Sequence, residues 1–354
     1  MTETLTRGAA PAPSWTDDFS GILTCVGITD VTHDVKSFTF ELPGSASLGF
    51  DPGQHLTFAF DIDGKLMERC YTISSAPSQP ARPTITVKRV PGGPVSNWLH
   101  DRLRVGDTVR AYGPLGRFST AMHPSHKYLF LSAGSGITPL MSMTRELRDR
   151  GDSADVVFVH CARTPDDIIF RHELDEIGRQ GRAAVTVLCE SDSPTERWGG
   201  PRGRLALPTL FAVAPDLLDR EIFTCGPPAY MTAVRELLGS VGVDPARCHE
   251  ESFLLGVPDD STPGATATRH RVELRRSGRV IECDSTTTIL AAASQSGLTL
   301  ASSCGEGVCG TCKSTLLAGR VDMRHAGGIR QREIDQGKVL VCCSKPLDDV
   351  VIDA

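Results

Sequence analysis

Four cysteines near the C-terminus have a spacing that suits electron transfer. Cys304, Cys309 and Cys312 form the pattern C-x4-C-x2-C, and Cys342 follows after a further twenty-nine residues. Four thiolates at this spacing can hold the two irons of a [2Fe–2S] cluster. The glycines at 305, 307 and 310 agree with this, because a loop around an inorganic core needs positive φ angles and backbone N–H groups close to the sulfurs. We therefore predict that these four cysteines bind the cluster.

Two other interpretations of the cysteines are a tetrahedral zinc site and a set of unrelated buried thiols. Zinc sites typically pair two C-x2-C elements or use histidine, and neither pattern occurs here. The fourth ligand is open between Cys342 and Cys343. Adjacent residues on a strand point to opposite faces, so only one of these two can reach the cluster.

A second motif, Arg69-Cys-Tyr71-Thr72 followed by Ser74, has residue types that suit a flavin. An arginine can hold the flavin phosphate, bidentately where geometry allows. The tyrosine offers an aromatic face to the ring, and the Thr72 hydroxyl can bond the N5 edge. The alternative is an ordinary strand with a half-buried tyrosine.

A glycine turn leading into a helix extends the predicted flavin site. Lys88 precedes the turn, Gly93 lies within it, and Val95 and Ser96 begin the helix. Backbone N–H groups and the helix dipole there favour a pyrophosphate. The alternative is a plain helix N-cap at Ser96. A later turn at 113–118, Gly-Pro-x-Gly-x-Phe, resembles that of FAD-binding reductases more than that of FMN-binding ones, and this resemblance implies FAD. The turn could instead simply close a barrel.

Two further glycine segments are predicted to bind a nicotinamide nucleotide. The first follows a short apolar strand and opens a helix, which lets a pyrophosphate approach the backbone; its candidate residues are Gly134, Gly136, Thr138 and Pro139. The second is Cys225-Gly226-Pro227, at the end of the last strand of a predicted parallel sheet. Open α/β sheets bind ligands at the carboxyl ends of their strands, so Cys225 should lie near the ligand crevice. The alternative for Cys225 is a small buried hydrophobic residue.

The elements that must position these residues change along the chain. Short runs rich in Val, Thr, Phe and Ile, such as 84–88, are separated by Gly and Pro and predict an antiparallel β-barrel. Apolar strands, the last at 221–224, then alternate with helices, one of them at 166–179, and predict an α/β domain with a parallel sheet. The last part contains a hairpin-like pair, a helix and the cysteine loop. The predicted boundaries are a flexible tail at 1–16, a flavin barrel at 17–122, a nucleotide domain at 123–256, a linker at 257–268 and a cluster domain at 269–354.

Together, these motifs resemble the ferredoxin–NADP reductase superfamily joined to a C-terminal plant-type ferredoxin. The resemblance implies a β-grasp fold for the last domain, with Cys342 as the fourth ligand because it fits a Leu-x-Cys pattern. It also implies that Arg163 contacts the nucleotide, that Glu251 and Phe253 lie beside the flavin, and that Cys225 sits by the nicotinamide and flavin N5.

The combined cofactors predict an electron relay. NADH or NADPH gives up two electrons as a hydride, a cluster accepts one, and a flavin can convert between the two. Tyr71, Thr72 and Cys225 would act by positioning rather than as acid, base or nucleophile. The segments His33-Asp34-Val35-Lys36 and Val95-Ser-Asn-Trp98-Leu-His resemble reductases of Rieske-type demethylases of quaternary amines such as glycine betaine or stachydrine.

Other acceptors remain open at this stage. They are a hybrid-cluster protein, a steroid hydroxylase and a phenylacetyl-CoA epoxidase. A cluster-based redox sensor and a stand-alone flavin reductase are the rival classes. The net charge of −6 offers no basic excess for nucleic acid. No segment approaches the length of a membrane span, and the N-terminus lacks the apolar core of a secretory signal, so we expect a cytoplasmic protein with neither nucleic-acid nor membrane partners.

Overall fold

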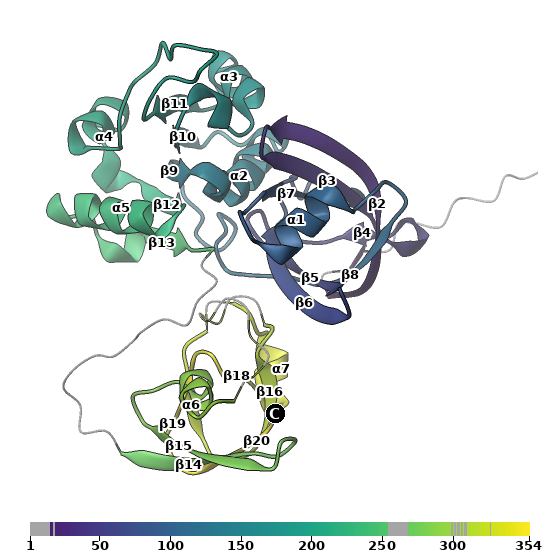
Figure 1. Ribbon diagram of the computed structural model, residues 1–354. Helices are drawn as coiled ribbons and strands as arrows, with labels where there is room; N and C mark the ends of the chain where they lie inside the picture. Colours follow the sequence, from purple (N-terminus) through teal and green to yellow (C-terminus); the bar gives the residue numbers. More distant parts are fainter. Residues whose placement is uncertain are drawn as a thin grey trace, which may run out of the picture.

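The computed structural model describes residues 15–16, 18–253, 268–298, 300, 302, 305, 307, 310–325 and 327–354. These residues form three domains that follow one another along the chain (Figure 1). The predicted tail and linker lie almost wholly outside the described residues, and so do Cys304 and Cys309. Among the described residues, no helix is both long and apolar enough to cross a membrane.

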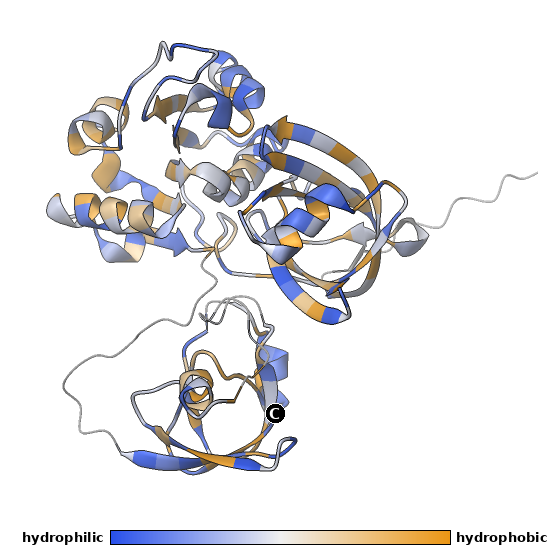
Figure 2. Cartoon of the chain, viewed as in Figure 1, coloured by the Kyte–Doolittle hydropathy of each residue, from blue (hydrophilic) through white to orange (hydrophobic). Residues whose placement is uncertain are grey.

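The first domain is an antiparallel sheet of six strands that curls into a barrel. A bridge between Ile73 and Ile85 brings its two edge strands together. Hydrophobic and hydrophilic residues alternate along the strands (Figure 2), and one set of side chains fills the interior, including Phe38, Phe40 and Phe58. In sheet order the strands are β6 (Lys65–Thr72), β5 (His55–Ile62), β8 (Thr108–Leu115), β2 (Phe19–Thr32), β3 (Val35–Glu41) and β7 (Thr84–Lys88). Helix α1 (Pro94–Asp101) follows β7, and the short strands β1 (Trp15–Thr16) and β4 (Ser47–Leu48) pair with each other.

The second domain is a parallel five-stranded sheet with helices on both faces. Its strands are apolar throughout because both faces are covered. Phe130 packs in a core cluster with residues of α2 and α3, whereas Leu129 and Leu131 pack in another with residues of α4 and α5. The strand order is β11 (Ala184–Cys189), β10 (Asp155–Ala162), β9 (Lys127–Ala133), β12 (Glu221–Cys225) and β13 (Cys248–Glu251). The helices are α2 (Ile137–Asp149), α3 (Arg171–Arg179), α4 (Leu207–Val213) and α5 (Pro228–Ser240).

Helix α3 is shorter than its sequence indicates. Periodicity alone predicts a helix from Asp166, but α3 begins at Arg171. Buried Ile168 and Ile169 lie between a short 3-10 turn and the helix, and Phe170 has a left-handed φ of 58°. The helix therefore cannot extend back through Phe170 to Asp166.

The third domain is a mixed five-stranded sheet packed against α6 (Ile289–Gln295), which is the β-grasp arrangement. Its central strand β20 (Val350–Asp353) runs parallel to β14 (Arg269–Leu274) and antiparallel to β16 (Lys313–Ala318). The order is completed by β15 (Arg279–Asp284) and β18 (Lys338–Leu340) at the edges. Also present are α7 (Gln331–Asp335) and a pair formed by β17 (Val321–Met323) and β19 (Ser344–Pro346).

Candidate functional site

The two glycine segments predicted to bind a nucleotide meet at the carboxyl edge of the parallel sheet. Cys225 ends β12 and pairs in register with Ser132 of β9. A Cβ atom on Gly136 would lie 2.3 Å from the carbonyl oxygen of Cys225. Gly134 has a positive φ of 52°, and α2 begins directly after this turn. Only glycine at 136 lets the two segments come this close.

The remaining predicted nucleotide residues in these segments shape the same corner. Thr138 and Pro139 are buried in the first turn of α2, where the Thr138 hydroxyl donates to the Ser135 carbonyl at 3.1 Å. Gly226 lies beneath Tyr230, because a Cβ atom there would come within 2.6 Å of its ring. Pro227 is the N-cap of α5. Two helices therefore begin at this corner, and their N-termini suit a pyrophosphate.

Two buried acidic groups, a thiol and a carboxyl, lie side by side at this edge. Cys225 of β12 pairs in register with Glu251 of β13. Burial raises the pKa of Glu251 to about 8, and burial, followed by the nearby Glu251, raises that of Cys225 well above its ordinary value. Both groups are therefore protonated at neutral pH, which agrees with a positioning role for Cys225. Among the described residues, Oε2 of Glu251 has no hydrogen-bond partner, while Phe253 two residues later is 44% exposed.

The predicted flavin motif occupies the end of β6 in the barrel. Thr72 is buried opposite His55, and Tyr71 lies opposite Leu56 and packs against Phe58 with ring centroids 6.0 Å apart. Burial raises the pKa of Tyr71, so its hydroxyl stays protonated. Arg69 donates to the backbone of its neighbour Glu68 at 2.7 Å.

The Ser74 backbone joins the flavin segment to the nucleotide domain. Its hydroxyl is used inside the barrel, with Thr86 Oγ1 at 2.8 Å. Its carbonyl accepts from Arg145 of α2, and Arg145 also pairs with Glu173 and lies 4.6 Å from the ring centroid of Phe170. Arg145 therefore fixes α2 against the flavin segment, a role that no sequence motif indicates.

The predicted phosphate turn is tightly organised by its own side chains. The N-cap of α1 is Gly93 and Pro94 is the first helical residue, so the interpretation of Ser96 as the N-cap is wrong. The Ser96 hydroxyl instead folds back onto the turn, accepting from Val90 N–H at 3.1 Å and donating to the Gly93 carbonyl at 3.2 Å. Val95 is buried. Among the described residues no side chain caps the N-terminus of α1, and the first N–H groups of a helix are donors that an anion can accept from.

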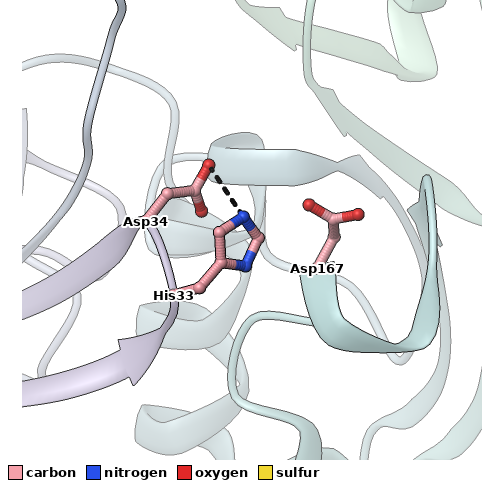
Figure 3. A group of neighbouring side chains, drawn as sticks. All are labelled: His33, Asp34 and Asp167. Atoms are coloured by element: carbon pink, nitrogen blue, oxygen red, sulfur yellow. Dashed lines mark ion pairs between the residues drawn. The ribbon is translucent and has the colours of Figure 1, made fainter. Parts of the chain in front are cut away.

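Lys88 and Arg163 are both engaged by carboxylates where the barrel meets the nucleotide domain. His33, Asp34 and Asp167 bring their ligand atoms within 4.8 Å of one another (Figure 3). Lys88 Nζ lies 2.7 Å from Asp34, and Arg163 lies 3.0 Å from Asp167. Because each carboxylate already has a cationic partner, we assign this cluster to interdomain contact rather than to a metal.

The described part of the cysteine loop is arranged for thiolate ligands. Cys312 and Cys342 are buried and Cys343 is half-buried. The N–H of Gly307 donates to Cys342 Sγ at 3.2 Å, the type of bond that supports and tunes cluster sulfurs. The three loop glycines have φ angles of 77°, 70° and 74°, which confirms the predicted positive values.

The cysteine loop also touches the barrel, through the turn at 113–118. A Cβ atom on Gly310 would lie 3.5 Å from the side chain of Leu115. Gly116 N–H donates to the Gly327 carbonyl at 3.4 Å, and Arg330 donates to the Pro114 carbonyl at 3.1 Å. The sequence indicates this turn only as a guide to the flavin. In the structure the turn is also where the ferredoxin domain contacts the barrel.

A short path across the barrel links the flavin motif to the cysteine loop. His55 pairs with Thr72 on one side and with Leu115 on the other, and neighbouring strands lie about 5 Å apart. Leu115 then contacts Gly310. The predicted flavin edge and cluster loop are thus separated by two strand spacings and one side-chain contact.

The residues present fit the three predicted groups. The unpartnered carboxyl oxygen of Glu251 and the glycine cradle at 136 suit a nucleotide ring and its pyrophosphate. The buried thiols at 312 and 342 suit iron. An isoalloxazine between them would meet Tyr71 and Thr72.

Comparison with known proteins agrees with this geometry. Three family models match in order: an oxidoreductase FAD-binding domain at residues 23–120, an oxidoreductase NAD-binding domain at 130–236, and a 2Fe-2S iron-sulfur cluster binding domain at 272–347. They confirm the predicted FAD, nicotinamide nucleotide and cluster.

Relatives of the whole chain have the same three-part organisation. The chain is 43% identical to the glycine betaine monooxygenase reductase subunit of Pseudomonas aeruginosa, covering 94% of both chains. It is 42% identical to the stachydrine N-demethylase reductase subunit of Rhizobium meliloti, covering 94% of this chain and 96% of that one. It resembles the solved phthalate dioxygenase reductase with a TM-score of 0.59 and 26% identity, covering 95% of this chain and 98% of that one. The chain therefore belongs to the family of ferredoxin–NADP reductase-type oxidoreductases that carry electrons from NAD(P)H through FAD to a 2Fe-2S cluster within one chain.

Proposed function

We propose that this chain is the reductase subunit of a Rieske-type oxygenase that demethylates a quaternary amine. The observation that carries the relay within the chain is the contact of the cysteine loop with Leu115, two strands from Thr72. The full-length likeness to the glycine betaine and stachydrine reductase subunits supports this class of partner.

The proposed site roles follow from the geometry. FAD, when bound, takes a hydride from NAD(P)H and returns its two electrons singly. Gly134, Gly136 and Gly226 hold the nucleotide close to the backbone, while buried Cys225 and neutral Glu251 pack beside its ring and exclude water.

The flavin and cluster ligands are assigned in the same way. Tyr71 and Thr72 orient the ring, while Arg69 and the first turn of α1 hold its phosphates. Cys304, Cys309, Cys312 and Cys342 hold the irons, with Cys342 favoured over Cys343 because it accepts the Gly307 N–H bond. The domain boundaries, a cytoplasmic location and the absence of nucleic-acid partners stay predictions.

Reconstitution tests the proposal. The purified chain, a Rieske oxygenase active on glycine betaine and another active on stachydrine are combined with NADH or NADPH, and formaldehyde release is measured. We expect demethylation with at least one oxygenase and loss of it in Cys309→Ser. This partner class is contradicted if the chain oxidises NAD(P)H rapidly with ferricyanide as acceptor but no formaldehyde forms with either oxygenase. A cluster that stays oxidised while the flavin is reduced would contradict the relay.

A further inference from the structure

Two arginines of the ferredoxin domain lie directly beside the cysteine loop. Gly328 N–H donates to the Gly307 carbonyl at 2.9 Å, so the segment 327–328 packs on the loop. Arg330 follows as the N-cap of α7, and Arg332 lies in the first turn of that helix. We call Gly327, Gly328, Arg330 and Arg332 the docking face.

One carboxylate of the barrel is shared by both arginines. Asp18 forms ion pairs with Arg330 and with Arg332. The side chain of Arg332 is 55% exposed and that of Asp18 is 48% exposed. Exposed ion pairs contribute little to stability, so another carboxylate can take the place of Asp18.

The charge of the ferredoxin domain differs in sign from that of the rest of the chain. Residues 268–354 contain twelve Lys and Arg against ten Asp and Glu, a net charge of +2, within a chain of net charge −6. Arg276, in the turn between β14 and β15, pairs with Asp353. Strands β14 and β15 lie on the side of the domain away from the barrel (Figure 1). The docking face therefore places two guanidinium groups next to a segment that packs on the cysteine loop.

We propose that the docking face binds an acidic surface of the electron-accepting protein, and that Asp18 competes with that protein for Arg330 and Arg332. This inference rests on the proposed function, in which the cluster passes electrons to a partner. In the structure the Asp18 ion pairs hold the ferredoxin domain against the barrel, with the cysteine loop beside Leu115 and near the flavin motif. Once the domain separates from the barrel, the same guanidiniums are available to carboxylates of the acceptor, with which arginine pairs well.

The test uses the full-length holoprotein and two one-electron haem acceptors of opposite charge. Cytochrome b5 is the acidic probe and cytochrome c is the basic one. The variants are Arg332→Glu, Asp18→Asn and, as a control of equal charge change, Arg276→Glu. KM and kcat are measured with each probe, and cluster reduction without acceptor is followed by stopped flow. Ferricyanide reduction by the flavin and the cluster spectrum report that each variant is intact.

We expect Arg332→Glu to raise KM for cytochrome b5 about tenfold and to lower it for cytochrome c, because charge at an interface rim mainly changes association. Asp18→Asn should lower KM for cytochrome b5 and slow cluster reduction. Arg276→Glu should change either KM less than about twofold.

Equal effects of Arg332→Glu and Arg276→Glu, or an increase of KM for cytochrome b5 in Asp18→Asn, would overturn the docking face. If the wild-type protein reduces ferricyanide but neither haem protein, electrons do not leave the chain through the cluster as proposed. That result would contradict both the proposed function and this inference.

Discussion

Replacing Gly136 with alanine tests the corner where the two nucleotide segments meet. The φ of Gly136 is −65°, so alanine suits the backbone and only its Cβ atom matters. That atom would lie 2.3 Å from the Cys225 oxygen, 2.4 Å from its carbonyl carbon and 2.6 Å from Gly226 N. All three are backbone atoms at the end of a central strand, so no side-chain rotation relieves the contact.

The size of the effect follows from these distances. Real Cβ contacts are not shorter than 3.0 Å, so Cys225 and Gly226 must retreat from positions that α2 and β9 fix. Overpacking of this kind costs about 1–3 kcal/mol of stability. A displacement of about 1 Å at a reacting centre lowers a rate by about 10²-fold. We therefore expect flavin reduction by NAD(P)H to slow by about 10- to 100-fold.

The matched control is Gly151→Ala at the other end of α2. Among the described residues, Gly151 has nothing within 4 Å of its Cβ position, but its φ is positive, so alanine costs about 1–2 kcal/mol without a clash. Anaerobic stopped-flow reduction of the flavin by NADH and NADPH is the assay, with dithionite reduction and FAD content as checks. Flavin reduction in Gly136→Ala within about twofold of the wild type, or equal loss in both variants, would refute the close approach as the reason for glycine.

Three further predictions concern the cluster, the buried carboxyl and the domain contact. Cys342→Ser should abolish the cluster absorption and its electron paramagnetic signal, whereas Cys343→Ser should keep both; the reverse would make Cys343 the ligand. The pKa of Glu251 is raised from 4.5 to about 8, so the folded chain keeps a proton that the unfolded chain loses, and stability falls as pH rises between these values. The melting temperature of Glu251→Gln should therefore exceed that of the wild type by an increasing margin from about pH 6 to about pH 8. The exposed control Glu250→Gln should follow the wild type. Melting temperatures of Glu251→Gln and wild type that change in parallel with pH would contradict this. Arg145→Ala removes the closer of the two cations of Glu173, leaving Arg148 at 3.7 Å, and removes the Arg145 donor of the Ser74 carbonyl. It should therefore cost about 2 kcal/mol in denaturant unfolding followed by flavin release, with Arg145→Lys losing less. An unchanged midpoint would show that Arg145 does not hold α2 against the flavin segment.

Element types were well predicted where a segment is long or strongly patterned. The strand predicted at 84–88 is observed with these bounds, and the strand predicted at 221–224 extends by one residue. The predicted start of α3 at Asp166 was wrong, because a 3-10 turn at Pro165–Asp167 and the left-handed Phe170 precede the helix, and helical periodicity does not reveal such a break. Helix α4 was not predicted, since its seven residues are too few to show a clear helical period.

The candidate residues likewise divide into those that a local motif reveals and those that only packing reveals. Those within a motif could be found from sequence because their chemistry depends on local spacing. Lys88, Arg163 and Ser74 were selected for a ligand, yet the structure also gives each of them a partner within its own domain: Asp34 for Lys88, Asp167 for Arg163 and the Thr86 hydroxyl for Ser74. Arg145 carries no motif at all, and only the packing of α2 against the barrel reveals it.

The sequence by itself determined which groups could bind iron, flavin and nucleotide, and that glycines must surround them, because thiolate spacing and backbone φ are local properties. Only the tertiary structure decided how these groups connect. Gly136 meets Cys225 because two parallel strands end at one edge, and Arg330 reaches Pro114 and Asp18 across 216 and 312 residues of sequence. Contacts at such separations depend on how whole domains pack, which no local pattern encodes.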